Sequence, residues 1–192
     1  MKRLATACVL ILLSCLMGTV LEATPITYQA SLDGAQTVPA TGSLATGSGT
    51  VTVDPTTHLL TFQISWTNLA ATPSGLHVHC CAPAGANGML AINFQGFPAA
   101  TSGMYFQTVD LTVAMLYNPA FLTAHGGTAA QAEADLLAGL AAGNSYLDIN
   151  NPPFGGGEIR GQLAAVPEPA TALLLATGLA SIAARSHKRR LW

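Results

Sequence analysis

The distribution of hydrophobic residues divides the chain into three parts. Two long apolar runs lie near the ends, at Leu4–Leu21 and Ala170–Ala184, and neither contains a charged residue. Between them, short segments alternate apolar and polar residues and are separated by Gly, Pro, Ser and Asn. Alternation with a period of two is typical of β-strands that bury one face. The pattern therefore predicts a β-domain with a hydrophobic helix at each end.

The middle of the chain predicts about eight short strands. In Leu59–Trp66 every second residue is apolar, and these residues share one face: Leu60, Phe62, Ile64 and Trp66. A turn at residues 54–57 joins this strand to Thr50–Val53 as a hairpin. The other predicted strands are Ile26–Leu32, Gly75–Cys80, Leu90–Phe94, Thr108–Met115, Ser145–Asn150 and Gly157–Leu163. Strands of this number and spacing favour an all-β fold, an antiparallel β-sandwich or barrel.

One segment, Thr128–Ala142, breaks the alternation. Leu136 and Leu140 lie one helical turn apart and share a face. Thr128 and Gln131 have the spacing of a capping box at the start of a helix. The sequence therefore predicts one short helix within the β-domain.

Residues 1–23 have the features of a secretory signal peptide. Lys2 and Arg3 precede the apolar run, and small residues surround Ala23. Cleavage after Ala23 would leave a domain at residues 24–165. Two alternatives stay open: lipidation at Cys15, which ends a lipoprotein-like Leu-Leu-Ser-Cys segment, and an uncleaved signal anchor.

The second apolar run has fifteen residues. As a helix it spans roughly 22 Å, which is shorter than a hydrocarbon core of about 30 Å. The basic residues after it keep that end in the cytoplasm under the positive-inside rule. They are Arg185, Lys188, Arg189 and Arg190. The run is thus expected to enter a membrane but to be a poor permanent anchor; a plain tail anchor and a buried core helix are the alternatives.

The whole tail, residues 166–192, resembles the PEP-CTERM sorting signal. Pro167, Glu168 and Pro169 match its motif, and the short hydrophobic helix and basic end follow in the same order. The resemblance implies an envelope protein of a Gram-negative bacterium. It also implies recognition of the tail by an exosortase, a membrane transpeptidase-like enzyme that would cleave near the motif.

Charge and cysteine content limit what the domain at 24–165 can do. It has seven acidic residues and one basic residue, Arg160, for a net charge of −6. A single cation cannot neutralise a row of phosphates, which excludes nucleic acid as a partner. The only cysteines outside the signal peptide are Cys80 and Cys81, whose Cα atoms are expected about 3.8 Å apart, below the usual disulfide range. We therefore expect the domain to be held together by its core.

Four blocks of the middle segment resemble the CHRD domain, named after chordin. The blocks are residues 32–39 with 45–47, 75–79 with 84–88, 137–146, and 154–163. The resemblance implies an all-β extracellular module with no established enzymatic activity. The chain departs from the family at Asn150, where a histidine is frequent, and at Cys80 and Cys81, where small residues are usual.

His77 and His79 are the candidate metal ligands. They alternate on one predicted strand, so both side chains point to the same face, about 6.6–7 Å apart along the strand. Two imidazoles placed in this way can bind one copper or zinc ion, with Cys81 as the preferred third ligand and Cys80 or Asp148 as other choices. The alternative is that one histidine hydrogen-bonds to a loop while the other packs, with no cofactor.

The Gly-Leu-His-Val-His string also resembles a strand of copper–zinc superoxide dismutase. That enzyme needs further histidines on neighbouring strands. The remaining histidines of the domain, His58 and His125, do not have the required spacing. We therefore do not expect that enzyme.

Glu158 and Arg160 also alternate on one predicted strand. They are expected to form a structural ion pair with each other, or Arg160 to pair with Asp148. No nucleophile with an adjacent base and no phosphate-binding loop is visible in the sequence, so no catalytic residue is predicted.

These features together predict an exported, non-enzymatic protein. It would be tethered to the membrane by its C-terminus and then placed at the cell surface or in an extracellular polysaccharide matrix. Its expected partners are the export machinery, an exosortase, and an extracellular polysaccharide or protein. The alternative function is extracytoplasmic copper or zinc binding at His77 and His79.

Overall fold

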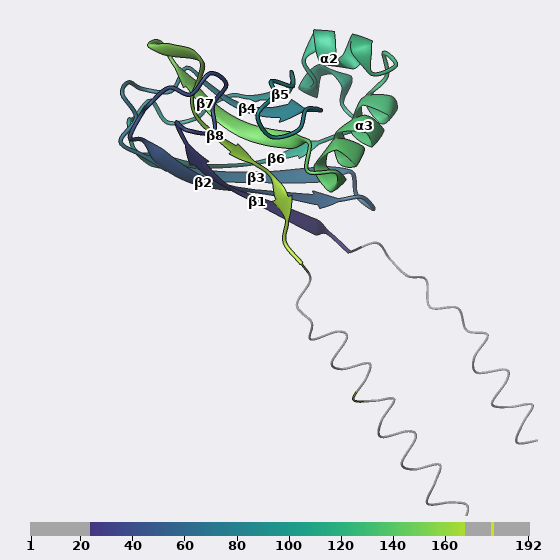
Figure 1. The fold of residues 1–192 in the computed structure, drawn as a ribbon. Coiled ribbons are helices and arrows are strands. Elements are labelled where there is room, and N and C mark those ends of the chain that lie inside the picture. Colours follow the sequence, from purple (N-terminus) through teal and green to yellow (C-terminus); the bar gives the residue numbers. More distant parts are fainter. Residues whose placement is uncertain (1–23, 168–177, 179–192) are drawn as a thin grey trace, which may run out of the picture.

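The computed structural model describes residues 24–167 and residue 178, and these residues form an antiparallel β-fold (Figure 1). The strands are β1 (Ile26–Asp33), β2 (Thr46–Asp54), β3 (Leu59–Thr67), β4 (Gly75–Cys80), β5 (Met89–Phe94), β6 (Gly103–Asp110), β7 (Ser145–Asn151), β8 (Phe154–Gln162) and β9 (Ala164–Ala165). They form one sheet with the order β5-β4-β7-β8-β1-β2-β3-β6, and β9 pairs with β1. The predicted all-β antiparallel class is confirmed.

The sheet folds over at β1 and β8, which pair in register only at Asp33 and Arg160. Figure 1 shows the two resulting layers, with β1, β2 and β3 in one and β4, β5, β7 and β8 in the other. The layers contact each other through aromatic rings, since Phe62 on β3 stacks on Phe94 on β5 with ring centroids 4.1 Å apart. The hydrophobic core therefore lies between two faces of the same sheet.

Strand β3 shows how the sequence pattern produces this core. The four apolar side chains predicted to share a face are all buried, and their polar neighbours point outward. Trp66 is buried with its indole N–H satisfied by the carbonyl of Ala100, at 2.9 Å. Burying a large ring in this way is favourable only because its polar atom keeps a partner.

The predicted helix is present as α3 (Ala129–Ala141). The Thr128 hydroxyl accepts a hydrogen bond from the Gln131 N–H, as the capping box requires. Leu136 and Leu140 are buried against the sheet. A second helix, α2 (Pro119–Ala124), and a 3-10 turn, η1 (Ala114–Leu116), were not predicted.

The predicted strand Thr108–Met115 is wrong in its second half. Strand β6 runs from Gly103 to Asp110, five residues earlier than expected at its start. The Asp110 carboxylate accepts hydrogen bonds from the Thr112 N–H, at 2.8 Å, and from the Thr112 hydroxyl, at 2.6 Å. These bonds close a turn and end the strand.

The two ends of the described domain lie side by side. Tyr28 of β1 pairs with Ala165 of β9, and the Val166 N–H donates to the carbonyl of Thr27. Residues 1–23, Glu168, Pro169 and the apolar run apart from Gly178 lie outside the described residues. Among residues 24–167 and 178, no helix is both long and apolar enough to cross a membrane.

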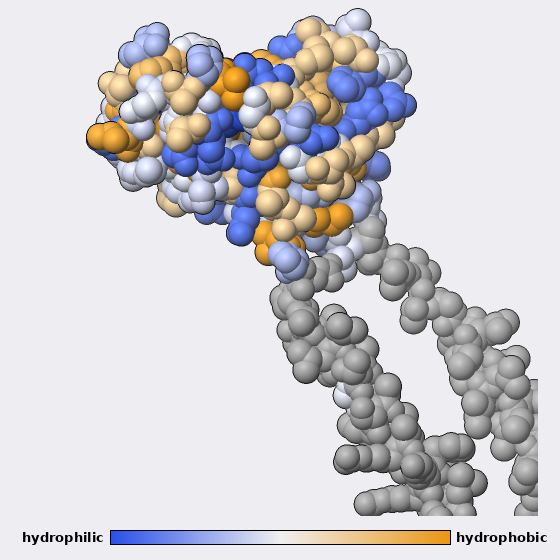
Figure 2. Space-filling model, in the orientation of Figure 1, coloured by the Kyte–Doolittle hydropathy of each residue, from blue (hydrophilic) through white to orange (hydrophobic). Residues whose placement is uncertain are grey.

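The domain surface mixes polar and apolar residues. Figure 2 shows that hydrophobic residues on the visible face occur in separate spots between hydrophilic ones. Scattered exposed apolar residues of this kind are ordinary for a folded domain.

Candidate functional site

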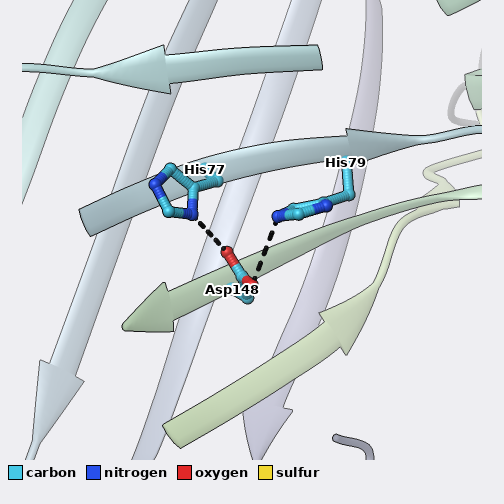
Figure 3. A group of neighbouring side chains, drawn as sticks. All are labelled: His77, His79 and Asp148. Carbon is cyan, nitrogen blue, oxygen red and sulfur yellow. Dashed lines mark hydrogen bonds and ion pairs between the residues drawn. The ribbon is translucent and has the colours of Figure 1, made fainter. Parts of the chain in front are cut away.

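His77 and His79 lie on the same face of β4, as predicted, because Leu76, Val78 and Cys80 take the buried face. Both imidazoles point toward Asp148 on the neighbouring strand β7 (Figure 3). Asp148 is directly opposite His77 in the strand register. The arrangement therefore follows from two adjacent strands whose alternation places polar groups on one shared face.

The three side chains converge closely. His77 Nδ1 is 3.0 Å from Asp148 Oδ1, and His79 Nε2 is 3.3 Å from Asp148 Oδ2. One ligand atom from each residue can be chosen such that all three lie within 4.8 Å of one another. The carboxylate is thus shared between the two imidazoles.

The site is largely shielded from solvent. The side chains of His77 and His79 are 12% and 16% exposed, and that of Asp148 is 4% exposed. Burial by itself raises the pKa of Asp148, but the contacts with both imidazoles outweigh it and hold that pKa below its ordinary value. Burial by itself lowers the pKa of His79, and contact with Asp148 outweighs it, so that pKa is raised. The local charge therefore favours a cation beside the carboxylate.

The His79 ring is held in place by its neighbours. Its Nδ1 is 3.0 Å from the carbonyl oxygen of Gly88, and its ring stacks on Tyr146 with centroids 4.7 Å apart and planes 5° from parallel. The Tyr146 hydroxyl in turn accepts from the Gly88 N–H at 3.2 Å. Arg160 lies over the Tyr146 ring, 3.4 Å from its centroid. Sequence reasoning missed these contacts, although Tyr146 and Asp148 alternate on the predicted strand 145–150 and so share a face.

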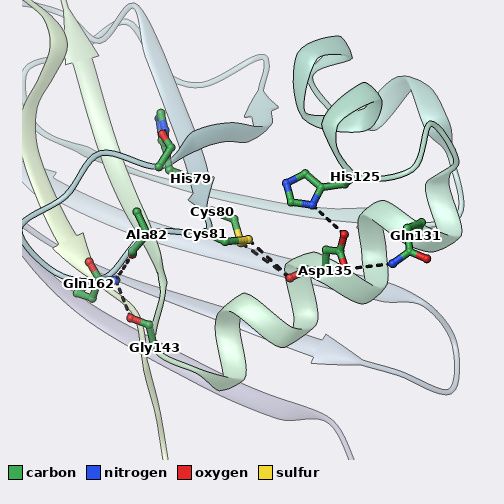
Figure 4. The surroundings of a disulfide bond; sticks show 10 residues. His79, Cys80, Cys81, Ala82, His125, Gln131, Asp135, Gly143 and Gln162 are labelled. Carbon is green, nitrogen blue, oxygen red and sulfur yellow. Dashed lines mark hydrogen bonds and ion pairs between the residues drawn. A yellow bond between two sulfur atoms is a disulfide. The ribbon is translucent and has the colours of Figure 1, made fainter.

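Cys81 does not join the two histidines. Cys80 and Cys81 form a disulfide across a cis peptide bond, and Figure 4 shows it lying against α3, away from the His79 ring. Its sulfur is therefore not available as a thiolate ligand. The prediction of Cys81 as third ligand is not supported, and the two cysteines form a disulfide although adjacent residues lie closer together than the usual disulfide range.

Gly139 on α3 provides the space in which the disulfide packs. A Cβ at position 139 would collide with Cys80 Sγ and lie 3.0 Å from Cys81 Sγ. Replacing Gly139 with alanine is therefore expected to lower the free energy of unfolding by about 1–3 kcal/mol through overpacking. In an ordinary helix interior the same change stabilises by about 1 kcal/mol.

Urea unfolding of four proteins measures this effect. The substitution is made in the wild-type chain and in a chain with Cys80→Ala and Cys81→Ala, where the obstructing sulfurs are gone. We expect Gly139→Ala to be destabilising only in the wild-type background. Equal effects in both backgrounds would show that the glycine does not serve the disulfide.

The remaining histidines of the domain have carboxylate partners of their own. His58 Nδ1 is 2.8 Å from Glu133, and His125 Nδ1 is 2.8 Å from Asp135. Both carboxylates belong to α3, and Figure 4 shows the second pair near the disulfide. Within residues 24–167, neither His58 nor His125 belongs to the group formed by His77, His79 and Asp148.

The predicted ion pair between Glu158 and Arg160 is not found in the described part of the chain. The Glu158 carboxylate is fully buried and accepts hydrogen bonds from the Ser43 hydroxyl, the Ala70 N–H and the Asn151 side-chain amide. Arg160 donates instead to the side-chain oxygens of Asn87 and Gln162. It makes no ion pair with Asp148 either, because both carboxylate oxygens of Asp148 face the histidines.

Comparisons with known proteins agree with this architecture. The CHRD domain model matches residues 28–163, and the PEP-CTERM protein-sorting motif matches residues 165–190. No curated protein and no solved structure matches the chain. The C-terminal motif marks an exported, envelope-associated protein that is processed by an exosortase. Because the CHRD match covers more than half of the sequence, the chain belongs to the CHRD domain family.

Proposed function

We propose that this chain is a non-enzymatic surface protein whose CHRD domain has a structural or adhesive role outside the cell. In this proposal the C-terminal segment tethers the exported chain to the membrane until an exosortase releases it to the cell surface or the extracellular matrix. The outward face of β1, β2, β3 and β6 is the observation that carries the adhesive role.

This face has three rows of uncharged side chains that run across the strands. The register aligns Thr27, Thr52, Thr61 and Thr108 in the first row, Gln29, Thr50, Gln63 and Phe106 in the second, and Ser31, Ser48, Ser65 and Met104 in the third. Several hydroxyl pairs bond across strands, such as Thr27 with Thr52 at 2.9 Å. Lysine and glutamate, which commonly cover exposed strands, do not occur in these rows.

A shallow groove of about 650 Å³ crosses the second and third rows. Its polar lining consists of serine and threonine hydroxyls and glutamine amides, with no charged side chain. Both groups donate and accept hydrogen bonds. At the edge of the sheet, Phe106 is 63% exposed and provides an aromatic surface. A neutral, hydroxyl-rich polysaccharide is the partner that this combination supports best.

Introducing a charge into the groove tests this role. Gln63→Glu changes one amide into a carboxylate of nearly the same shape. We expect the mature protein to bind the extracellular polysaccharide of its own cells at least about tenfold more weakly, because burying an unpaired charge costs more than about 1.4 kcal/mol.

Gln95→Glu is the matched control, since Gln95 is exposed and lies outside the groove. Co-sedimentation with the polysaccharide measures retention of both variants. Equal retention of Gln63→Glu and Gln95→Glu would contradict binding at this face. Loss of both would indicate that net charge, and not the groove, controls retention.

A second candidate function, extracytoplasmic metal binding, is favoured by the convergence of His77 and His79 on Asp148. The test is copper and zinc content of the purified domain with and without His77→Ala and His79→Ala. Negligible metal in both preparations would remove this function.

A further inference from the structure

One nitrogen of His79 is buried beside a carboxylate without a hydrogen-bond partner. Nδ1 of His79 lies 3.0 Å from the Gly88 carbonyl, and a carbonyl oxygen can only accept, so Nδ1 carries the hydrogen. In the neutral ring, Nε2 then presents a lone pair. That atom is buried, makes no hydrogen bond among the described residues, and faces Asp148 Oδ2 at 3.3 Å.

Two lone pairs facing each other at this distance repel, so the contact needs a positive charge between or on the partners. A proton on Nε2 is one solution, and a bound metal cation is the other. The fixed Nδ1–H···O=C bond is the arrangement that orients histidine ligands in metal sites, because it determines the tautomer and aims Nε2 at the metal.

His77 presents its other nitrogen to the same carboxylate. Its Nδ1 is 3.0 Å from Asp148 Oδ1, whereas its Nε2 lies against the backbone of Gly75. A Cβ at position 75 would be 2.5 Å from that Nε2, so only glycine leaves room for the ring in this position. The sequence Gly-Leu-His therefore holds the His77 Nδ1 in the site.

We propose that His77 Nδ1, His79 Nε2 and the Asp148 carboxylate bind one divalent transition-metal ion, Cu(II) or Zn(II), which takes the place of the proton that His77 Nδ1 donates to Asp148 Oδ1 and releases that proton to solvent. This proposal rests on the second candidate function and names its third ligand and its metal class. Two imidazoles and one carboxylate suit these borderline metals, whereas Ca²⁺ and Mg²⁺ prefer all-oxygen ligand sets. Donor atoms around one such ion lie roughly 3–4 Å apart. Those of the three side chains lie within 4.8 Å of one another, so a small side-chain movement brings them to that spacing.

The surroundings hold the three ligands in place. Asp148 comes from β7 and the histidines from β4, so the ligands belong to two hydrogen-bonded strands and not to a loop. The Gly88 peptide is held at its carbonyl by His79 and at its N–H by Tyr146. The imidazole side chains are 12% and 16% exposed, so an ion can reach them from solvent.

The experiment uses the mature protein secreted by its own cells and titrates it with Cu(II) and with Zn(II) against a competing chelator. We expect one ion per chain, and for Cu(II) an electron paramagnetic resonance spectrum with hyperfine coupling to two nitrogens. Asp148→Asn and His79→Gln are each expected to weaken binding by more than about tenfold. His125→Gln is the matched control, because His125 has an equivalent carboxylate partner elsewhere.

Circular dichroism of each variant confirms that it is folded before binding is compared. If the folded wild-type protein binds neither metal, both the metal-binding function and this site are wrong. If it binds metal and Asp148→Asn leaves the affinity unchanged, the two histidines bind without the carboxylate and the three-ligand assignment is overturned. If His125→Gln abolishes binding, the ion binds at a different site.

Discussion

Replacing Glu158 with glutamine is expected to lower the free energy of unfolding by about 3 kcal/mol. The carboxylate is fully buried and accepts from three separate segments of the chain: the loop before β2, the loop after β3, and β7. Glutamine places an NH₂ group on one side. The Ala70 N–H reaches both carboxylate oxygens, at 2.9 and 3.1 Å, so the NH₂ group faces this donor on either side, and on the Oε2 side it also faces the Asn151 amide.

A flip of the Asn151 side-chain amide cannot relieve this conflict. Its Oδ1 already accepts from the Phe154 N–H at 3.2 Å, and a flip would break that bond. Thermal or urea unfolding measures the loss. Glu133→Gln is the matched control, because the partner of Glu133 is His58, whose side chain is 49% exposed. A pair with one half-exposed member contributes much less to stability than a fully buried carboxylate. Equal losses in the two variants would contradict the stabilising role of Glu158.

Changing Pro167, Glu168 and Pro169 together to alanine is expected to keep most of the protein in the membrane fraction with its C-terminal segment still attached. The sorting motif covers these residues, and without it an exosortase has no signal to recognise. We expect the short apolar run with its basic end to hold this variant at the membrane. Fractionation followed by mass spectrometry of each fraction measures the outcome.

Pro98→Ala provides the control, because Pro98 is exposed and lies within the domain. It is expected to be released normally. Release of the triple variant at the same shortened mass as the wild type would show that the Pro-Glu-Pro motif is not needed for processing.

Strands that bury one face could be predicted from the sequence. In β3 the alternation is strict, and the predicted and observed faces agree. In β6 it failed, because this edge strand has no buried residue and alternates only between partly buried and exposed positions. The hydrophobic pattern of the sequence therefore does not identify such a strand. Helix α2 could have been predicted from a local signal at its start, where Asn118 is the N-cap and Pro119 follows it.

The candidate site was predictable only in part. The same-face placement of His77 and His79 follows from the two-residue period of a strand. The choice of Asp148 over Cys81 depends on the register of β7 against β4, which joins residues 71 positions apart. The disulfide depends on how β4 ends against α3, and this is likewise a tertiary contact.

The role of Glu158 was missed for a related reason. Sharing a strand face with Arg160 suggested a pair, but buried hydrogen-bond donors from distant loops hold the carboxylate instead. A glutamate that is completely buried can only be recognised once the loops around it are known.

The β-domain is expected to act outside the cell after both hydrophobic ends have been removed. The intact mass of the protein recovered from the medium and cell surface measures this directly. A chain that begins near Thr24 and ends near Pro167 is the predicted result. A protein found in the cytosol with both ends intact would contradict it.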